Sequence, residues 1–436
     1  MGDAPITHAG VPMDGTAIEP TLVLTFFGHG NGGTQRRAIP RGGLLLGRDE
    51  VVFDDAFDDF RMAARHAEIR IDSGRVLIRD LGSDIGTRLN GQLLLGERAL
   101  EPGDVLRLGD TLLVYAPSSA SSAIAEPELV GASATMVAVR RSVDAVATRK
   151  HIVVVTGETG TGKEVVARLV HQRSGRTGPF VAVNCGTFTE GLLASDLFGH
   201  VRGAFTGAVA EQQGLFRAAR GGTLLLDEVA EIPLALQANL LRVLETQEMR
   251  PVGSTRDVAT DVRVIATSNR ELIDLVQAGR FRSDLYSRLA QWTIRLPPLR
   301  DRREDIPALT SHLLARCDGV DRKLTPDLAE ALLVHEWPLN VRGLLTVLSV
   351  AVVSAPVDEP LSLGSEVRLA LSTSRSLAAG PEKSEPAVLG KADLTQLMEH
   401  FQGKVAAAAR HLGITRPRLY RLLWAQDIKP ARFRVA

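Results

Sequence analysis

Short runs of apolar residues mark the first part of the chain as a region of β-strands. Between residues 21 and 116 the pattern predicts only strands, separated by turns rich in glycine and aspartate. Several short strands with turns at close spacing favour a small all-β sandwich. The predicted strands span residues 22–27, 44–46, 67–71, 76–78 and 112–115.

The pattern then changes twice along the chain. A long central segment alternates between strand and helix patterns, as in a parallel α/β sheet, and a helical segment follows it. Stretches rich in serine, alanine and proline predict linkers. The predicted fold is therefore multidomain. Its segments are a loose tail (1–20), an all-β sandwich (21–116), a linker (117–127), an α/β domain (128–297), a helical part (298–357), a second linker (358–390) and an all-α C-terminal domain (391–436).

A glycine-rich stretch between a predicted strand and a predicted helix is the first candidate site. The strand 152–155 leads into a turn of the form G-x-x-x-x-G-K that ends at Lys163. Glycines let backbone N–H groups face phosphate oxygens, and the following helix terminus adds partial positive charge. Glu164 stands where this motif usually has a serine or threonine that binds magnesium. The predicted nucleotide-binding residues are Gly157, Glu158, Thr159, Gly160, Thr161, Gly162, Lys163 and Glu164.

Two carboxylates end a second apolar strand downstream. Asp227 is suited to hold Mg²⁺, and Glu228 is suited to polarise the attacking water as a general base. A strand that merely ends in solvated acids is the alternative interpretation. The nearby phosphate-binding motif favours ATP hydrolysis, because phosphoryl transfer depends on positioned charges of this kind.

Further polar residues end other predicted strands or follow them. Asn184 ends the strand 180–184, and Ser268 and Asn269 follow the strand 262–266, where an amide can sense the γ-phosphate or orient water. Arg282 and Arg288 come next along the chain. An arginine supplied from a neighbouring subunit can stabilise the transferring phosphoryl group. A solvated basic helix face is the alternative for these two arginines.

Composition adds limits rather than a function. A chain of 436 residues has room for two to four domains, and its formal net charge of +0 requires a local patch for any nucleic-acid partner. The two cysteines, Cys185 and Cys317, have no metal-ligand spacing, which favours a reducing, cytoplasmic setting. No apolar run approaches eighteen residues and no signal peptide is evident, so no membrane partner is predicted.

The central segment carries a specific family resemblance. The sequence Gly-Ala-Phe-Thr-Gly-Ala at residues 203–208 resembles the sigma-contacting loop of bacterial enhancer-binding proteins, the AAA+ activators of sigma-54 RNA polymerase. The resemblance extends over residues 129–350. It implies that the loop contacts the sigma-54 RNA polymerase holoenzyme through Gly203, Ala204, Phe205, Thr206, Gly207 and Ala208.

The same resemblance implies roles for the candidate site residues. Asn184 would partner Glu228 in a switch that couples nucleotide state to the loop, and Ser268 and Asn269 would form the first sensor. The trans arginine fingers would be Arg282 and Arg288, and Arg342 would be the second sensor, on a helical lid. The resemblance also implies a ring-shaped homo-oligomer, expected to be a hexamer, with ATP and Mg²⁺ as cofactors.

The β segment resembles a forkhead-associated (FHA) domain, a reader of phosphothreonine. The resemblance rests on Gly47-Arg48, Arg65-His66-Ala67, the stretch 80–87 from Asp80 to Thr87, Asn90-Gly91 and Gly103-Asp104. What remains of the family's binding pocket would be Arg48, Arg65, Ser83 and Thr87.

Two residues of the FHA pattern are replaced here. Ala63 stands for the phosphate-binding serine and Ile85 for the asparagine that holds the peptide, and the segment 49–59 is acidic. We therefore expect a folded domain that binds phosphothreonine weakly. It would instead dock an unidentified protein or serve as an intramolecular regulatory surface.

The C-terminal segment is the candidate DNA-binding domain. Residues 391–436 hold nine lysines and arginines against three acidic residues, a local charge of +6. Helices at 405–412 and 415–424 with a short turn between them predict a helix-turn-helix, and the segment resembles the Fis-type domain. A solvated basic helical hairpin is the alternative. The residues predicted to lie near double-stranded DNA upstream of target promoters are Thr415, Arg416, Arg418, Tyr420 and Arg421.

These features favour an ATP-dependent transcription activator that binds enhancer-like DNA and remodels the sigma-54 closed complex. One alternative is a AAA+ protein remodeller unrelated to transcription, which the loop at residues 203–208 argues against. The other is an FHA-type signalling adaptor with little ATPase activity, which the presence of Lys163, Asp227 and Glu228 argues against.

Overall fold

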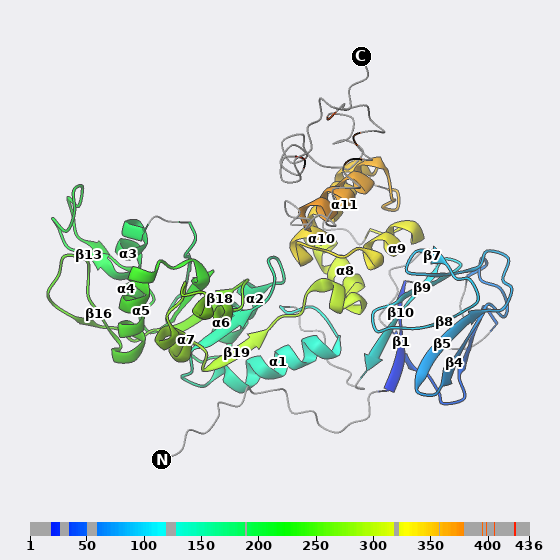
Figure 1. Cartoon of the computed structure of the whole chain (residues 1–436), viewed down its shortest axis with the longest axis horizontal. Coiled ribbons are helices and arrows are strands. Elements are labelled where there is room, and N and C mark those ends of the chain that lie inside the picture. Colours follow the sequence, from blue (N-terminus) through cyan, green and yellow to red (C-terminus); the bar gives the residue numbers. More distant parts are fainter. Residues whose placement is uncertain are drawn as a thin grey trace. The chain divides into compact units, whose positions relative to one another are not determined.

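The structure is a computed structural model, and Figure 1 shows its elements. The chain divides into two compact units, Met1–Arg375 and Ser376–Ala436. The described residues are 19–26, 35–49, 59–118, 128–187, 190–317, 322–356 and 358–378, together with Thr395, Met398, Val405 and Leu423.

The N-terminal domain is a sandwich of two antiparallel sheets, which confirms the predicted all-β fold. Apolar side chains from both sheets, such as Leu22, Ile69, Ile78 and Leu113, are fully buried between them. One sheet has the order β2-β1-β10-β9-β6-β7 and the other β3-β4-β5-β8. Their strands are β1 (Glu19–Phe26), β2 (Gln35–Ala38), β3 (Leu44–Leu46), β4 (Ala67–Asp72), β5 (Arg75–Asp80), β6 (Thr87–Leu89), β7 (Gln92–Leu93), β8 (Glu97–Ala99), β9 (Val105–Leu108) and β10 (Thr111–Ser118).

The α/β domain is built on a parallel five-stranded sheet with the order β12-β15-β18-β11-β19. Its strands are β11 (Val153–Thr156), β12 (Phe180–Asn184), β15 (Thr223–Asp227), β18 (Arg263–Ser268) and β19 (Trp292–Arg295). The strands are nearly continuous apolar runs because helices cover both faces. Parallel strands end at the same edge, so Thr156, Asn184, Asp227 and Ser268 meet there.

Helices pack on the two faces of this sheet in two separate cores. One core contains α1 (Ala134–Ala147) and α2 (Lys163–Gln172), and the other contains α3 (Glu190–Phe198), α5 (Leu234–Thr246) and α7 (Ser283–Leu289). The smaller elements of the domain are β13 (Gly199–His200), β14 (Gln212–Gln213), α4 (Leu215–Ala218), η1 (Val229–Glu231), β16 (Glu248–Met249), β17 (Val258–Ala259) and α6 (Leu272–Gln277).

A helical lid follows the α/β domain, and Figure 1 shows its helices gathered as one group. Leu313, Trp337, Leu344 and Leu348 are among its buried core residues. Its elements are η2 (Leu299–Asp301), η3 (Arg303–Asp305), α8 (Ile306–Cys317), α9 (Pro326–Val334), α10 (Asn340–Ser354) and α11 (Ser365–Ala378).

The predicted linker at residues 358–390 is wrong over part of its length, because α11 occupies residues 365–378. Val367 and Leu371, one helical turn apart, bury against the lid core. The serine-rich composition obscured this short apolar stripe. The lid therefore extends beyond the predicted boundary at residue 357.

Beyond α11, the four described residues of the second unit are helical, and Met398, Val405 and Leu423 are buried. The predicted DNA-contacting residues, from Thr415 to Arg421, lie outside the described residues. Among the helices that the structure describes, none combines the length and apolar character required to cross a membrane.

Candidate nucleotide and partner sites

The glycine-rich loop joins β11 to α2, as the sequence predicts. Gly157, Gly160 and Gly162 all have positive φ, and Gly162 directly precedes the first turn of α2. The Lys163 Nζ donates to the carbonyl oxygens of Gly157 at 2.7 Å and Glu158 at 3.1 Å. Burial lowers the pKa of Lys163, and the nearby carboxylates of Asp227 and Glu228 oppose that shift. The lysine therefore lies between the loop and the acidic pair.

One predicted loop residue does not face the loop. The Glu164 carboxylate accepts hydrogen bonds from Arg168 at 3.1 and 2.7 Å, on the exposed face of α2. This pair has the i,i+4 spacing that brings side chains together on a helix surface. The Glu164 side chain is thus paired with Arg168, and its contact with the nucleotide stays a prediction.

The acidic pair at the end of β15 has a constrained geometry. Glu228 has a φ of 56°, a left-handed conformation that costs a non-glycine residue of order 1–3 kcal/mol. Its backbone N–H donates to Thr267 Oγ1 at 3.1 Å, and that hydroxyl donates to Asp227 Oδ1. Strain of this kind concentrates at functional sites. Thr267 fixes both acidic residues at once, although the sequence analysis assigned it no role.

Asn184 contacts the acidic pair from the neighbouring strand. Its Nδ2 approaches Asp227 Oδ2 at 3.4 Å, and its Oδ1 accepts from the Gly186 N–H at 2.8 Å. Among the contacts of the described residues, no hydrogen bond joins Asn184 to Glu228. The proposed switch between those two side chains stays a prediction.

The first-sensor residues lie where the sequence predicts, at the end of β18. Ser268 is fully buried, its Oγ donates to the Arg270 carbonyl at 2.6 Å, and its own carbonyl accepts from the Gly157 N–H at 3.2 Å. Asn269 is exposed. Ser268 therefore ties the end of β18 to the glycine-rich loop, and the sensing roles of both residues stay predictions.

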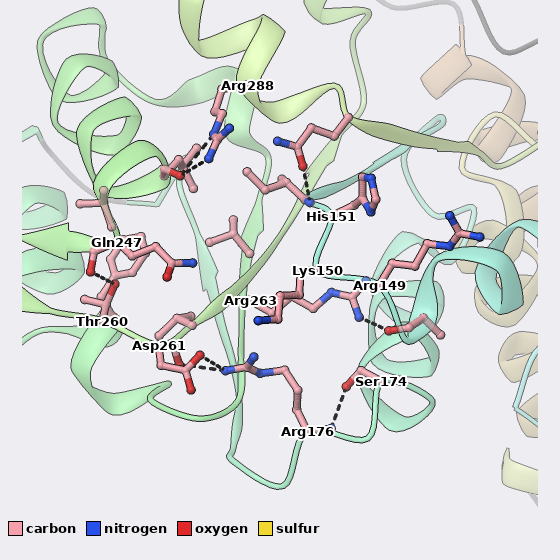
Figure 2. A pocket seen from close by; sticks show the side chains of 18 of the residues that line it. Arg149, Lys150, His151, Ser174, Arg176, Gln247, Thr260, Asp261, Arg263 and Arg288 are labelled. Carbon is pink, nitrogen blue, oxygen red and sulfur yellow. Dashed lines mark hydrogen bonds and ion pairs between the residues drawn. The ribbon is translucent and has the colours of Figure 1, made fainter.

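Arg288 lies in a pocket of about 370 Å³, shown in Figure 2. Its guanidinium donates to the Leu244 carbonyl at 3.2 and 2.9 Å, whereas exposed Arg282 pairs with Asp284 at 2.8 Å. The pocket is lined by residues just before β11 and β18, such as Ile152 and Val262. Basic side chains around it include Arg149, Lys150, Arg176 and Arg263, and His151 also lines it.

This pocket lies at the opposite edge of the sheet from the glycine-rich loop. The loop begins after Thr156, the last residue of β11. The pocket is lined by residues that come just before Val153, the first residue of β11. Because the strands are parallel, Arg288 and Lys163 of one chain lie at opposite edges. Arg288 is therefore remote from the glycine-rich loop of its own chain, and its role as a trans arginine finger stays a prediction.

The lid approaches the glycine-rich loop directly. Exposed Arg342 adds to the effect of burial in lowering the pKa of Lys163, which places its charge near the loop. Glu158 pairs with Arg300 through two hydrogen bonds of 2.9 and 2.7 Å, and Asn340 donates to Glu158 at 3.1 Å. Arg300 and Asn340 are not predicted as site residues, because nothing in the sequence marks them except that Arg300 follows the strand ending at Arg295 and Asn340 precedes Arg342 by two positions.

The segment from 201 to 211 forms the loop of a small hairpin between β13 and β14. Within it, the Gly203 N–H donates to the Ala208 carbonyl at 2.8 Å, and the Ala208 N–H donates to the Phe205 carbonyl at 3.0 Å. The Phe205 ring is 43% exposed and packs edge-on against His200, with 5.0 Å between ring centroids. The hairpin thus presents an exposed aromatic side chain next to the exposed hydroxyl of Thr206.

In the β sandwich, two of the four predicted pocket residues, Ser83 and Thr87, form hydrogen bonds within the domain. Ser83 Oγ donates to Asp80 Oδ2 at 2.7 Å and lies 3.0 Å from His66 Nε2, and buried Thr87 donates to the same Asp80 oxygen at 2.7 Å. Burial would raise the pKa of Asp80, but hydrogen bonds from Thr87 and Ser83 outweigh it and lower that pKa. These bonds hold the turn after β5 in place.

The remaining predicted pocket residues are more accessible. Arg65 is exposed, and Arg48 lies 3.5 Å from the Asp49 carboxylate. Asp59 belongs to the acidic run but is buried, where it accepts from Thr111 Oγ1 at 2.8 Å. Asp59 therefore cannot repel a phosphate at the surface as the sequence analysis assumed, and residues 50–58 lie outside the described part of the chain.

Four family models match separate parts of the chain. Residues 129–295 match the sigma-54 interaction domain, residues 44–109 the FHA domain, residues 300–366 the AAA+ ATPase lid domain, and residues 391–423 a bacterial regulatory protein of the Fis family. The predicted FHA, AAA+ and helix-turn-helix domains are confirmed.

Several relatives align with a large part of the chain. The chain is 39% identical to the response regulator protein PilR of Pseudomonas aeruginosa over 74% of its own length and 76% of PilR. It is 40% identical to the regulatory protein AtoC of Escherichia coli over 64% of its own length and 63% of AtoC. It therefore spans somewhat less than two thirds of AtoC. The crystal structure of NtrX from Brucella abortus in complex with ATP matches with a TM-score of 0.50 and 32% identity, over 70% of each chain. By these matches, the chain belongs to the family of sigma-54-dependent transcriptional regulators.

Proposed function

We propose that this chain hydrolyses ATP and uses the energy to remodel the sigma-54 RNA polymerase closed complex, after binding double-stranded DNA upstream of target promoters. The observation that carries the proposal is the exposed pair Phe205 and Thr206 on the same domain as the glycine-rich loop and the acidic pair. The test is open-complex formation on a sigma-54 promoter with purified protein and ATP. Promoter opening without ATP, or none with it, would contradict the proposal.

In the proposed reaction the loop N–H groups and Lys163 bind the phosphates, and Glu228 takes a proton from the attacking water. The carboxylates of Asp227 and Glu228 offer the oxygen donors that Mg²⁺ prefers, and Asp227 would hold the ion. When bound, Mg²⁺ neutralises charge on the phosphate oxygens. The left-handed backbone at Glu228, anchored by Thr267, keeps the base in one orientation.

The placement of Arg288 at the far edge of the sheet supports a ring of identical subunits. Arg288→Ala subunits are expected to bind ATP but hydrolyse it poorly, and Lys163→Ala subunits to bind it weakly. Mixing the two should restore part of the activity, since a site formed by an intact Lys163 and a neighbour's intact Arg288 reappears. The measurement is the ATPase rate across mixing ratios. A rate that never exceeds the sum of the separate variants would argue against shared sites.

We further propose that the FHA domain regulates the ATPase by docking on the lid of its own chain. Arg107 of β9 is buried and pairs at 2.7 Å with both Asp327 and Glu330 of α9. Beside this pair, Val105, Leu112 and Val114 pack with the lid core. One face of the sandwich is thus occupied by α9, and a lid held in this way is restrained from moving.

Loss of this ion pair should release the lid. Arg107→Ala leaves Glu330, which is 7% exposed, without its main partner, and breaking a buried pair costs about 3–5 kcal/mol. We expect the ATPase rate to rise several-fold. Arg88→Ala is the matched control, because exposed Arg88 reaches the same Glu330 only at 3.5 Å. A double change to Arg107→Met and Glu330→Leu should restore docking and the basal rate. An unchanged ATPase rate in folded Arg107→Ala protein would contradict the docking role.

Phosphothreonine binding by the FHA domain is expected to be weak. Ala63 and Ile85 remove two donors, and each hydrogen bond to a charged group contributes roughly 1.5–3 kcal/mol. Ser83 and Thr87 are engaged with Asp80 and do not replace them. Calorimetry of the full chain with a degenerate phosphothreonine peptide library tests this expectation. Low-micromolar binding that disappears on dephosphorylation would overturn it and would point to exposed Arg65 as the substitute donor.

A further inference from the structure

The carbonyl oxygens of the glycine-rich loop all receive hydrogen bonds. Lys163 Nζ donates to those of Gly157 and Glu158, and the Val166 N–H donates to that of Gly162. A loop that binds phosphate must turn its N–H groups toward the anion, so its carbonyls need partners on the outer side.

The other three loop carbonyls, those of Thr159, Gly160 and Thr161, accept hydrogen bonds from residues that come after the last strand of the sheet, β19, in the chain. Asn340 Nδ2 donates to the Thr159 carbonyl at 3.0 Å, the Val341 N–H to the Gly160 carbonyl at 3.0 Å, and Arg302 to the Thr161 carbonyl at 3.2 Å. A Cβ on Gly160 would lie 2.1 Å from the Leu339 carbonyl. The start of α10 therefore contacts the loop backbone, and no side chain fits between them at Gly160.

Both the nitrogen and the oxygen of the Asn340 side-chain amide form hydrogen bonds at this contact. Its Nδ2 also donates to Glu158 Oε2 at 3.1 Å, and its Oδ1 accepts from the Leu299 N–H at 2.7 Å. The residue is fully buried and has a φ of 51°, a conformation that asparagine tolerates better than most residues. It stands two positions before Arg342, whose Cβ would lie 3.0 Å from a Cβ on Gly160.

We propose that Asn340, with Glu158 and Arg300, is a positioning group that holds the loop in its phosphate-binding conformation and sets the place of Arg342 relative to Lys163. The inference deepens the proposed ATPase function, since it assigns the coupling between loop and lid at the same site. Asn340 acts through backbone and side-chain contacts and touches no reacting atom. Glu158 contributes the charged end of the contact to Arg300.

The test is the relative affinity of the full chain for two magnesium nucleotides, ADP and the non-hydrolysed analogue AMP-PNP, measured by calorimetry. Asn340→Asp keeps the size and the acceptor oxygen but removes the Nδ2 donor and places a carboxylate beside Glu158. If Arg342 is displaced, binding of the triphosphate analogue should weaken more than binding of ADP, because the triphosphate carries more negative charge. We expect AMP-PNP to bind at least about tenfold more weakly, which is the effect of losing one hydrogen bond to a charged group. ADP should bind about threefold more weakly.

A double-mutant cycle with Arg342→Ala then tests whether the two residues act together. The combined variant should shift the ratio of the two affinities no further than Arg342→Ala alone, since coupled residues are not additive. Adding Glu158→Gln to the Asn340→Asp variant removes the repulsion between the two carboxylates and provides a new hydrogen-bond donor. The ratio of AMP-PNP to ADP affinity should then return most of the way to the wild-type value.

Asn90→Asp provides the matched control. Asn90 also has a left-handed backbone, with a φ of 52°, and its amide also bridges a carboxylate, at 2.7 Å to Asp104, and a backbone N–H. Among the contacts that the structure describes, it makes none with the glycine-rich loop and it supports Val105 beside the lid, so a change there should alter the binding of both nucleotides alike and leave their affinity ratio unchanged. An unchanged ratio in Asn340→Asp, or an equal shift in Asn90→Asp, would overturn the proposal.

If Asn340→Asp does not fold, Glu158→Gln alone decides between these outcomes. Its ion pair is partly exposed, with 41% and 36% of the two side chains accessible, so the fold should tolerate the change. We expect a two- to threefold selective loss of AMP-PNP affinity, roughly that of an exposed ion pair, and no selective loss would overturn the proposal. A wild-type chain that binds both nucleotides but hydrolyses none would contradict the proposed function alone.

Discussion

Replacement of Glu228 by glutamine is expected to cut ATP hydrolysis by roughly 10²–10⁴-fold, the usual contribution of a positioned general base. Glutamine keeps the size of the side chain and removes only its ability to accept a proton. The proposed phosphate contacts come from the loop and from Lys163, so the affinity for ATP should stay within a few-fold of wild type. Steady-state ATPase rates and calorimetric binding of MgATP provide the two measurements.

Glu231→Gln is the matched control for this experiment. Glu231 lies three positions further along, and its carboxylate pairs with Arg270 at 3.2 Å instead of lining the loop. Its replacement should leave hydrolysis almost unchanged. If Glu228→Gln hydrolyses ATP at the wild-type rate, another group must activate the water. Asp227 would then be the next candidate, because Thr267 binds its carboxylate and the backbone N–H of Glu228 at the same time.

The position of the candidate site along the sheet could be predicted from the sequence, because each of its strand residues ends an apolar run. Asn184 and Asp227 terminate strands whose interior is apolar, and parallel strands bring their carboxyl ends together. Thr267 could have been predicted in the same way. Its neighbour Ala266 pairs with Leu226, so Thr267 lies beside Asp227 at the ends of the two strands. The inference failed only because a threonine at a strand end carries no chemical signal by itself.

The contact between loop and lid could not be predicted in the same way. Arg300 and Asn340 reach Glu158 across 142 and 182 residues of chain, and no periodicity encodes that approach. The pairing of Arg107 with Glu330 spans 223 residues and joins two domains whose patterns are independent. Such contacts depend on how the domains pack, and a buried arginine in a β-strand reveals only that some partner must exist.

The second large effect is expected in the hairpin loop. Phe205→Ala or Thr206→Ala should abolish transcription from a sigma-54 promoter while leaving the ATPase rate within about twofold of wild type. Both residues are exposed on the hairpin closed by β13 and β14, and neither side chain is a proposed ligand of the nucleotide. An aromatic anchor of this kind can supply much of the energy of a protein contact, so its loss should uncouple hydrolysis from promoter opening.

Val209→Ala tests whether the effect belongs to those two positions. Val209 is 82% exposed and lies in the same hairpin, immediately after the six-residue motif. A truncation there should leave promoter opening intact. The Phe205 ring also packs against His200, whose Nδ1 lies 2.7 Å from Ser195 Oγ in α3, so Phe205→Leu serves as the variant that keeps an apolar anchor without the ring. Transcription at wild-type levels in Phe205→Ala and Thr206→Ala would show that the hydrolysis site drives some partner other than the polymerase, and the generic remodeller would then be the better interpretation.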